Sequence, residues 1–200
     1  MKDALLTVLR NKDSSLEEFR SAAHRLAHLV AAETAISSLQ EKISIETPLA
    51  RSEGFRPKNP VTLVAILRAA LVMLPPFLNF FPKASVGFLG IKRDESTARP
   101  IPYYENLPEL TSVHDIYLLD PMIATGGSAK YALERLLALG VSPSQITLIG
   151  FIAAKEGLSL LKSHFQTLKI KVVAQDAQLN AHKFIVPGLG DFGDRYFGTS

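Results

Sequence analysis

The chain has 200 residues, of which 47% are hydrophobic and 20% are charged, a composition typical of globular proteins. A chain of this length usually forms one domain, and we predict a single domain over residues 1–200. The 22 basic and 19 acidic residues leave a net charge of only +3, without a block of consecutive cationic residues. This balance argues against nucleic acid as a partner but permits a small anionic ligand.

Cysteine is absent, which excludes disulfides, thiolate zinc sites and a cysteine nucleophile. We therefore expect a cytoplasmic protein. The N-terminal stretch "MKDALLTVLRNKD" has an apolar run too short for a secretory signal. The apolar stretch 60–82 carries Arg68 near its middle and is interrupted by Pro75 and Pro76. It therefore predicts a buried strand and helix rather than a membrane span, so no membrane partner is expected.

The predicted elements alternate between helix and strand. Residues 1–40 are expected to form an N-terminal helical segment, because apolar residues recur at three- and four-residue steps from Leu16 to Val30. The next elements are a short strand and loop at 42–50, a strand at 61–66, a helix at 69–80, strands at 84–91 and 115–120, a helix at 128–140, a strand at 145–154, a helix at 155–165 and a strand at 169–175. This alternation indicates an α/β fold with a mainly parallel twisted sheet flanked by helices.

Two segments lack such periodicity. Residues 92–108 are polar and contain three prolines, which predicts an exposed loop. The last 17 residues, from Phe184, are rich in glycine and are predicted to contain neither a helix nor a regular strand. Their main chain is expected to be available for recognition. Asp194 and Arg195 within them are expected to pair on the surface.

The stretch "LLDPMIATGGSA", residues 118–129, carries the strongest chemical signal. Asp120 follows a strand, and the small residues from Ala124 to Ser128 surround main-chain N–H groups where a helix begins. Such N–H groups bind phosphate, while a carboxylate beside them can accept hydrogen bonds from sugar hydroxyls. The stretch therefore predicts a sugar phosphate. The alternative is a helix capped by Ser128 after a tight turn, without a ligand; P-loop and dinucleotide spacings do not match.

Four motifs, in the same order, resemble those of uracil phosphoribosyltransferases. They are "ILRAALVM", "KRDESTARPIPYYENLP", "LLDPMIATGGS", which is similar to the loop that binds phosphoribosyl diphosphate (PRPP), and "FIVPGLGDFGDRYFGT". The resemblance runs from about residue 16 to the C-terminus. It implies a type I phosphoribosyltransferase-like fold with an N-terminal helical arm and a flexible loop or hood. The implied reaction transfers the phosphoribosyl group of PRPP to N1 of uracil, giving UMP and diphosphate in pyrimidine salvage.

The resemblance also implies roles for individual residues. Catalytic roles fall to Arg68, Arg93 and Asp191. PRPP is expected to contact Arg68, Arg93, Asp120, Pro121, Met122, Ile123, Ala124, Thr125, Gly126, Gly127, Ser128 and Asp191. Uracil is expected in a base-binding segment, residues 184–199, against Ile185, Gly190, Asp191 and Phe192. Residues 92–111 would form an active-site loop, Mg²⁺ would be bound mainly through PRPP without a dedicated protein ligand, and the chain would form a homodimer or a higher homo-oligomer.

The chain departs from the family pattern around the base and the diphosphate. Ala70 and Gln178 stand where the family commonly has glycine, Phe184 replaces a tyrosine, and Phe192 replaces a small residue. These differences leave two alternatives open. One is a phosphoribosyltransferase for another base, and the other is a regulatory protein that binds PRPP or a nucleotide with an altered base pocket.

Overall fold

The computed structural model describes residues 1–38, 40–94 and 99–199, and the Arg93 side chain lies outside the described part. The helices are α1 (Lys2–Arg10), α2 (Leu16–Ile36), α3 (Leu74–Phe80), α4 (Gly127–Ala138), α5 (Lys155–His164) and α6 (Phe192–Phe197), with short 3-10 segments η1 (Ala69–Val72) and η2 (Pro143–Gln145). The strands are β1 (Gln40–Glu46), β2 (Arg51–Pro57), β3 (Val61–Leu67), β4 (Ser85–Arg93), β5 (Pro100–Asn106), β6 (Asp115–Leu119), β7 (Met122–Ile123), β8 (Ile146–Ala154), β9 (Lys169–Asp176), β10 (Gln178–Leu179) and β11 (Ile185–Val186).

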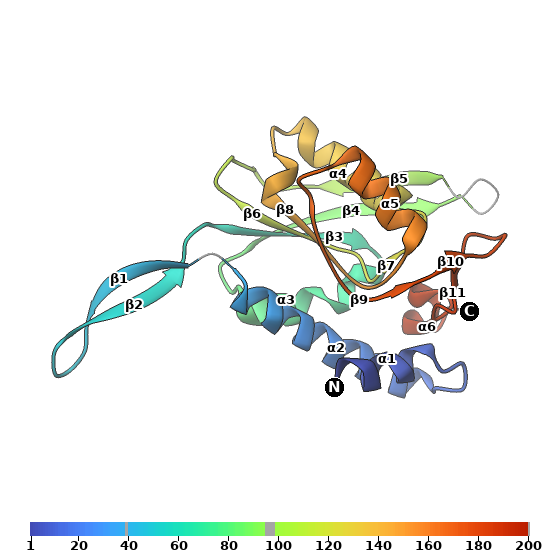
Figure 1. Ribbon diagram of the computed structural model, residues 1–200, viewed down its shortest axis with the longest axis horizontal. Coiled ribbons are helices and arrows are strands. Elements are labelled where there is room, and N and C mark those ends of the chain that lie inside the picture. Colours follow the sequence, from blue (N-terminus) through green and yellow to red (C-terminus); the bar gives the residue numbers. More distant parts are fainter. Residues whose placement is uncertain (39, 95–98, 200) are drawn as a thin grey trace.

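The central sheet has the strand order β5-β4-β3-β6-β8-β7, and β9 pairs with β8. All of its pairs are parallel except β4 with β5. Helices α4 and α5 lie on one side, and α1, α2, α3 and α6 lie on the other (Figure 1). The predicted α/β fold with a mainly parallel sheet is therefore confirmed.

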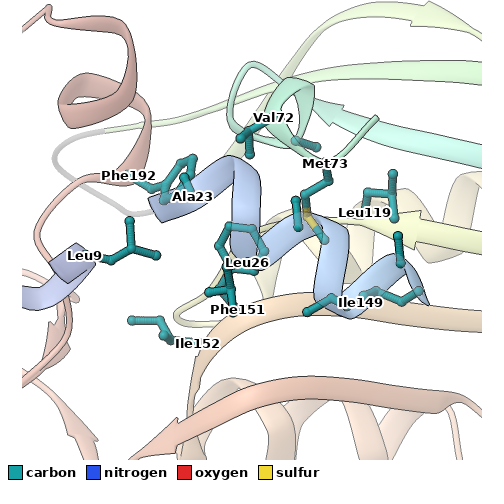
Figure 2. Packing of buried hydrophobic residues seen from close by; sticks show 14 of the residues in the cluster. Leu9, Ala23, Leu26, Val72, Met73, Leu119, Ile149, Phe151, Ile152 and Phe192 are labelled. Carbon is teal, nitrogen blue, oxygen red and sulfur yellow. The ribbon is translucent and has the colours of Figure 1, made fainter. Parts of the chain in front are cut away.

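Burial on both faces explains why the central strands are continuous apolar runs. Along β3, Leu63 and Ala65 pack on the side of α2, whereas Val64 and Ile66 pack on the side of α4. A strand with two covered faces cannot alternate apolar with polar residues. On the α2 side, core residues from α1, η1, β6, β8 and the C-terminal segment surround Leu26 (Figure 2).

Helix α2 begins where the sequence predicts. The Ser15 hydroxyl accepts the Glu18 N–H, and the Glu18 carboxylate accepts the Ser15 N–H at 2.7 Å. This reciprocal pair satisfies two N–H groups that the helix leaves free. The buried side of α2 includes Phe19 and Leu26, as the periodicity predicts. Within the described ranges, no helix is both long enough and apolar enough to cross a membrane.

Three segments differ from the sequence expectation. Strand β2 pairs with β1 in an antiparallel hairpin that projects from the body (Figure 1), although only its first strand was predicted. Strand β5 occupies part of the segment predicted as an irregular loop, because it pairs with the edge of β4. In the C-terminal segment, β11 pairs with β10, and Asp191 caps helix α6 by accepting the Asp194 N–H at 3.0 Å. The prediction that this segment lacks helix and strand was therefore wrong.

Candidate active site

Three adjoining hollows lie beyond the carboxyl ends of β3 and β6. The largest is a cleft of about 680 Å³ lined by Ile66, Leu67, Arg68, Ala69, Ile91, Lys92, Tyr103, Asp120, Met122, Ser128, Asp191, Gly193 and Asp194. A hollow of about 150 Å³, which we call the base hollow, is lined by Ala69, Asp120, Met122, Ala124, Lys183, Phe184, Ile185, Gly190, Asp191, Phe192 and Gly193. A hollow of about 100 Å³ follows residues 122–129 and also includes Asp120. Asp120 and Met122 border all three, so the hollows meet there.

The smallest hollow is formed by the loop that precedes α4. Gly126 has a φ of +80°, and α4 begins directly after it at Gly127. The N-cap residue is Gly126, which has no side chain, and Ser128 lies inside the helix, so the predicted alternative of a Ser128 cap is wrong. The Thr125 hydroxyl accepts the Gly127 N–H at 3.3 Å, and Ser128 lies in the first turn. The helix N-terminus and two hydroxyls therefore surround a hollow suited to an anion.

A glycine on α5 allows this loop to lie so close. A Cβ atom on Gly157 would be 2.4 Å from the Ala124 carbonyl oxygen, and one on Gly126 would be 3.0 Å from the Gly157 carbonyl oxygen. Neither position has room for a side chain. The sequence analysis missed Gly157, although a glycine inside an otherwise regular helix pattern is a recognisable sign of close main-chain approach.

Asp120 is a buried carboxylate at the point where the hollows meet. Asp120 is only 7% exposed, and its Oδ1 atom accepts a hydrogen bond from the Met122 N–H at 3.3 Å. Burial raises the pKa of Asp120 to about 7, because the charged form loses its hydration. In its ionised form the carboxylate can accept hydrogen bonds from two neighbouring hydroxyls.

Arg68 supplies positive charge to the cleft directly after β3. Its guanidinium lies 3.7 Å from Asp194 Oδ1 and 5.4 Å from the centre of the Phe197 ring. Lys92 also lines the cleft and was missed by the sequence analysis, although it directly precedes Arg93 in the polar segment. For Arg93, the structure describes only the main chain, at the end of β4.

The expected surface pair of Asp194 and Arg195 is not formed as predicted. Asp194 faces Arg68, whereas Arg195 donates to the carbonyl oxygens of Leu189 and Asn11 at 2.8 and 2.6 Å. Arg195 therefore joins the C-terminal segment to the turn after α1, and Asp194 joins it to the cleft.

The base hollow brings together the four residues expected near uracil. Ile185, Gly190, Asp191 and Phe192 all line it, and Asp191 also borders the large cleft. Apart from Arg93, whose side chain is outside the described part, the residues expected at PRPP cluster around the cleft and the loop hollow. The exception is Pro121, which is not among the residues that line them and whose carbonyl oxygen accepts the N–H groups of Phe151 and Ile152.

A family model described as Uracil phosphoribosyltransferase matches residues 2–199. The chain belongs to the uracil phosphoribosyltransferase family. A uracil phosphoribosyltransferase of Corynebacterium efficiens is 40% identical over 193 residues, which cover 96% of this chain and 90% of the relative. One of Salinibacter ruber is 38% identical over 194 residues, covering 97% and 91%. The solved structure of the AQ2163 protein from Aquifex aeolicus has a TM-score of 0.90 at 34% identity, covering 100% and 95%.

Membership of the uracil phosphoribosyltransferase family confirms the resemblance and extends it. The four motifs indicated similarity from about residue 16, whereas the family match begins at residue 2 and includes α1. Helix α1 packs against α2 through Leu5, Leu6 and Leu9. The N-terminal helix is therefore part of what this chain shares with the uracil phosphoribosyltransferases.

The main departure from the uracil phosphoribosyltransferase pattern, Phe192, is taken up by the core. Phe192 is 2% exposed, and its ring centre lies 5.4 Å from that of Phe19, 5.7 Å from that of Phe151 and 5.7 Å from that of Tyr196. Figure 2 shows Phe192 and Phe151 within the core on the α2 side. The ring thus packs mainly against α2 and β8, although the residue also borders the base hollow. Ala70 is likewise fully buried on the α2 side, and its neighbour Ala69 borders the cleft instead.

Proposed function

We propose that this chain transfers the phosphoribosyl group of PRPP to N1 of uracil, giving UMP and diphosphate. One observation carries the proposal. In a member of the uracil phosphoribosyltransferase family, an anion-binding loop, a buried carboxylate and a hollow bordered by Ile185 and Gly190 meet around one cleft. A phosphate, a sugar and a base can therefore be held side by side.

PRPP would lie across the cleft with each part against a matching group. The 5-phosphate binds the loop from Ala124 to Ser128, the ribose hydroxyls donate to Asp120, and the diphosphate lies against Arg68. The guanidinium presents several N–H donors to phosphate oxygens. The bond from C1 to N1 of uracil forms as the bond from C1 to the diphosphate oxygen breaks, and the N1 proton passes to the departing diphosphate or to solvent. Alignment and stabilisation of the leaving diphosphate are what the chain contributes.

Uracil selectivity would come from main-chain groups of the base hollow. Uracil offers a carbonyl, an N–H and a second carbonyl along one edge. A main-chain N–H near Gly190 or Phe192 that donates to O4 of uracil would face the amino group of cytosine, and two donors cannot pair. A buried donor without an acceptor costs about 1–3 kcal/mol, enough to discriminate against cytosine. Asp191, which borders the large cleft and the base hollow, would orient the reactants.

Mg²⁺ fits the donor set of the cleft. Asp120, Asp191 and Asp194 offer the hard oxygen atoms that this ion prefers. Across the described part of the chain, however, no group of three or more histidine, cysteine or acidic side chains could hold a metal ion. We therefore expect Mg²⁺ to bind mainly through PRPP, without a dedicated protein ligand, and the carboxylates of Asp191 and Asp194 would add negative charge near it. Bound there, the ion would neutralise charge on the departing diphosphate.

The active-site loop, residues 92–111, of which 95–98 lie outside the described residues, would close over the reactants and exclude water. A Cβ atom on Gly127 would be 3.6 Å from Pro100, which begins β5, and Tyr103 of the same strand lines the cleft. The strand thus already lies beside the phosphate loop. Closure would protect the reacting ribose from hydrolysis.

The reaction is expected to take place in the cytoplasm.

A homodimer or a higher homo-oligomer would be the working form. The β1–β2 hairpin projects from the body and exposes Ile45, Leu49 and Phe55, which are 40%, 97% and 59% accessible. Several exposed apolar side chains on one projecting element favour a role for this element in binding another chain.

The proposed reaction is tested by diphosphate release. The purified chain is given PRPP and Mg²⁺ with uracil, cytosine, hypoxanthine or adenine in turn. Release with uracil alone supports the proposal. Release with a different base would indicate another phosphoribosyltransferase, and PRPP binding without release would indicate a regulatory protein.

A further inference from the structure

An arginine on the N-terminal helix reaches the main chain of the base-binding segment. Arg10, in α1, donates from Nη1 and Nη2 to the two carboxylate oxygens of Asp176, at 2.8 and 2.6 Å. Its Nη1 also donates to the Gly188 carbonyl oxygen at 2.8 Å. Asp176 lies at the end of β9 and is 6% exposed. Arg10 holds the pKa of Asp176 below its usual value, so this buried carboxylate stays charged.

The same carboxylate holds the other polar group of Gly188. Asp176 Oδ2 accepts the Gly188 N–H at 2.9 Å, so both main-chain groups of this glycine are engaged by one ion pair. Gly188 has a φ of +61°, and a Cβ atom there would lie 2.1 Å from the Ile185 carbonyl oxygen. The chain therefore folds back tightly on Ile185, so a fixed Gly188 also fixes Ile185 at the base hollow.

A second arginine holds the next residue. Arg195 donates from Nη1 to the Leu189 carbonyl oxygen at 2.8 Å and from Nη2 to the Asn11 carbonyl oxygen at 2.6 Å. Its guanidinium lies 4.3 Å from the centre of the Phe19 ring. Leu189 is thus tied to the turn after α1. Gly190 therefore follows two residues, Gly188 and Leu189, whose main-chain groups are both held by hydrogen bonds.

We propose that Arg10 and Asp176 are positioning residues for base recognition, setting where the main-chain groups of Ile185 and Gly190 meet the base. The inference rests on the proposed function. Recognition by main chain depends on backbone placement, because no side-chain rotamer can correct an error. The phosphate loop is held by contacts with Gly157 instead. The pair should therefore govern uracil binding and selectivity without affecting PRPP binding.

Two conservative variants test this role. Arg10→Lys keeps the charge but loses the fork of donors, and Asp176→Asn keeps the shape but loses the charge. In each, we expect the KM for uracil to rise by roughly tenfold or more, since a charged hydrogen bond is lost. The preference for uracil over cytosine should fall, while the Kd for PRPP stays within about twofold of the parent value.

The control removes a different contact of the same helix. Lys2 in α1 pairs with Glu33 of α2 at 2.9 Å, remote from the base-binding segment, so Lys2→Ala should leave the uracil KM and selectivity unchanged. If both test variants keep parental uracil KM and selectivity, the proposal is wrong. Equal losses of uracil and PRPP affinity would also overturn it, because they indicate general unfolding. A parent chain that does not use uracil refutes the proposed function instead.

Hydrogen exchange of the parent chain gives a readout that needs no variant. Since Asp176 accepts the Gly188 N–H, this amide should exchange slowly, and adding PRPP and uracil should change its rate little. Fast exchange that slows only when uracil is bound would show that the base, rather than the ion pair, orders this turn, and would overturn the proposal.

Discussion

Asp120 shows how one buried residue can link folding, pH and substrate binding. Burial in the floor of the cleft removes hydration from the carboxylate. The 3.3 Å hydrogen bond from the Met122 N–H stabilises the charged form by less than burial destabilises it. Its pKa of about 7 means that the ionised form is held at a cost. Ribose hydroxyls that donate hydrogen bonds to the carboxylate would stabilise its ionised form. The carboxylate is therefore suited to a ligand that is rich in hydroxyl groups.

Asp120→Asn should reveal this cost as a pH-dependent gain in stability. The pKa of Asp120 is about 7 in the folded chain and has a usual value of 3.8. Between these values the folded state binds more protons than the unfolded state, so the free energy of unfolding of the parent falls as pH rises. The free energy of unfolding of the variant should not fall in this way. Above pH 7 it should exceed that of the parent, relative to low pH, by at most about 4 kcal/mol. Urea denaturation at pH 5 and pH 8 measures the difference.

PRPP affinity should show the opposite trend in the same pair of proteins. The parent should bind PRPP more tightly as pH rises through about 7, because the ionised carboxylate accepts two hydrogen bonds. Asp120→Asn should bind weakly and lack that component of the pH dependence. Stability and binding profiles that run parallel in parent and variant would contradict this account.

Phe192→Ala tests whether this ring belongs to the core. Deleting a fully buried phenylalanine should lower the free energy of unfolding by about 3–5 kcal/mol. Phe55→Ala is the matched control, because Phe55 is 59% exposed on the hairpin and should change stability by less than about 0.5 kcal/mol. Equal denaturation midpoints for Phe192→Ala and the parent would show that the ring does not support the fold.

At the scale of elements, the phosphate loop depends on an approach between two helices that only glycine permits. Gly157→Ala would place a methyl group 2.4 Å from the Ala124 carbonyl oxygen and displace the loop. Displacing a binding loop should weaken PRPP binding by roughly tenfold or more. Isothermal titration calorimetry with PRPP measures the loss.

Gly140→Ala is the control for a glycine that the loop does not need. Gly140, unlike Gly157, has a positive φ, of +86°, and among the described residues no atom would lie within 4 Å of an added Cβ atom. The substitution should cost roughly 1–2 kcal/mol of stability through backbone strain and leave PRPP affinity unchanged. The same loss of PRPP affinity in both variants would show that strain, not loop packing, is responsible.

Elements buried on both faces could be predicted from sequence, whereas elements held by distant partners could not. Strand β8 is a continuous buried apolar run, so its identity is local information. Strand β2 is polar and mostly exposed, and its register is supported by ion pairs such as Arg56 with Glu41 at 2.5 Å. Strand β5 forms because the edge of β4 is available. Helix α6 is short and glycine-rich, and its start depends on the Asp191 cap.

At the scale of the whole molecule, the parts of the candidate site that are contiguous in sequence could be predicted, whereas the parts that depend on distant partners could not. Its loop from Asp120 to Ser128 is contiguous, so its chemistry was visible in the sequence. The burial of Phe192 among Phe19 and Phe151 and the reach of Arg10 to Asp176 join segments far apart in the chain. Such contacts exist only after the sheet and helices have assembled, and no local pattern indicates them.

The projecting hairpin predicts association between copies of the chain. We expect a homodimer or a higher homo-oligomer in sedimentation equilibrium, weakened by the double substitution Leu49→Ser with Phe55→Ser, because both side chains are exposed and apolar. Leu139→Ser, at a 45% exposed leucine on the end of α4, is the control and should not change the mass. A monomeric parent chain, or equal effects from both surfaces, would contradict this expectation.

The proposed reaction joins the ribosyl group to N1 of uracil within one cleft. Its most direct test is product identification by NMR after incubation of the chain with PRPP, Mg²⁺ and ¹⁵N-labelled uracil. We predict UMP in which the ribose C1 is bonded to the labelled N1, with an equal amount of diphosphate. Ribose 5-phosphate and unchanged uracil, or a mixture without any reaction, would contradict the account.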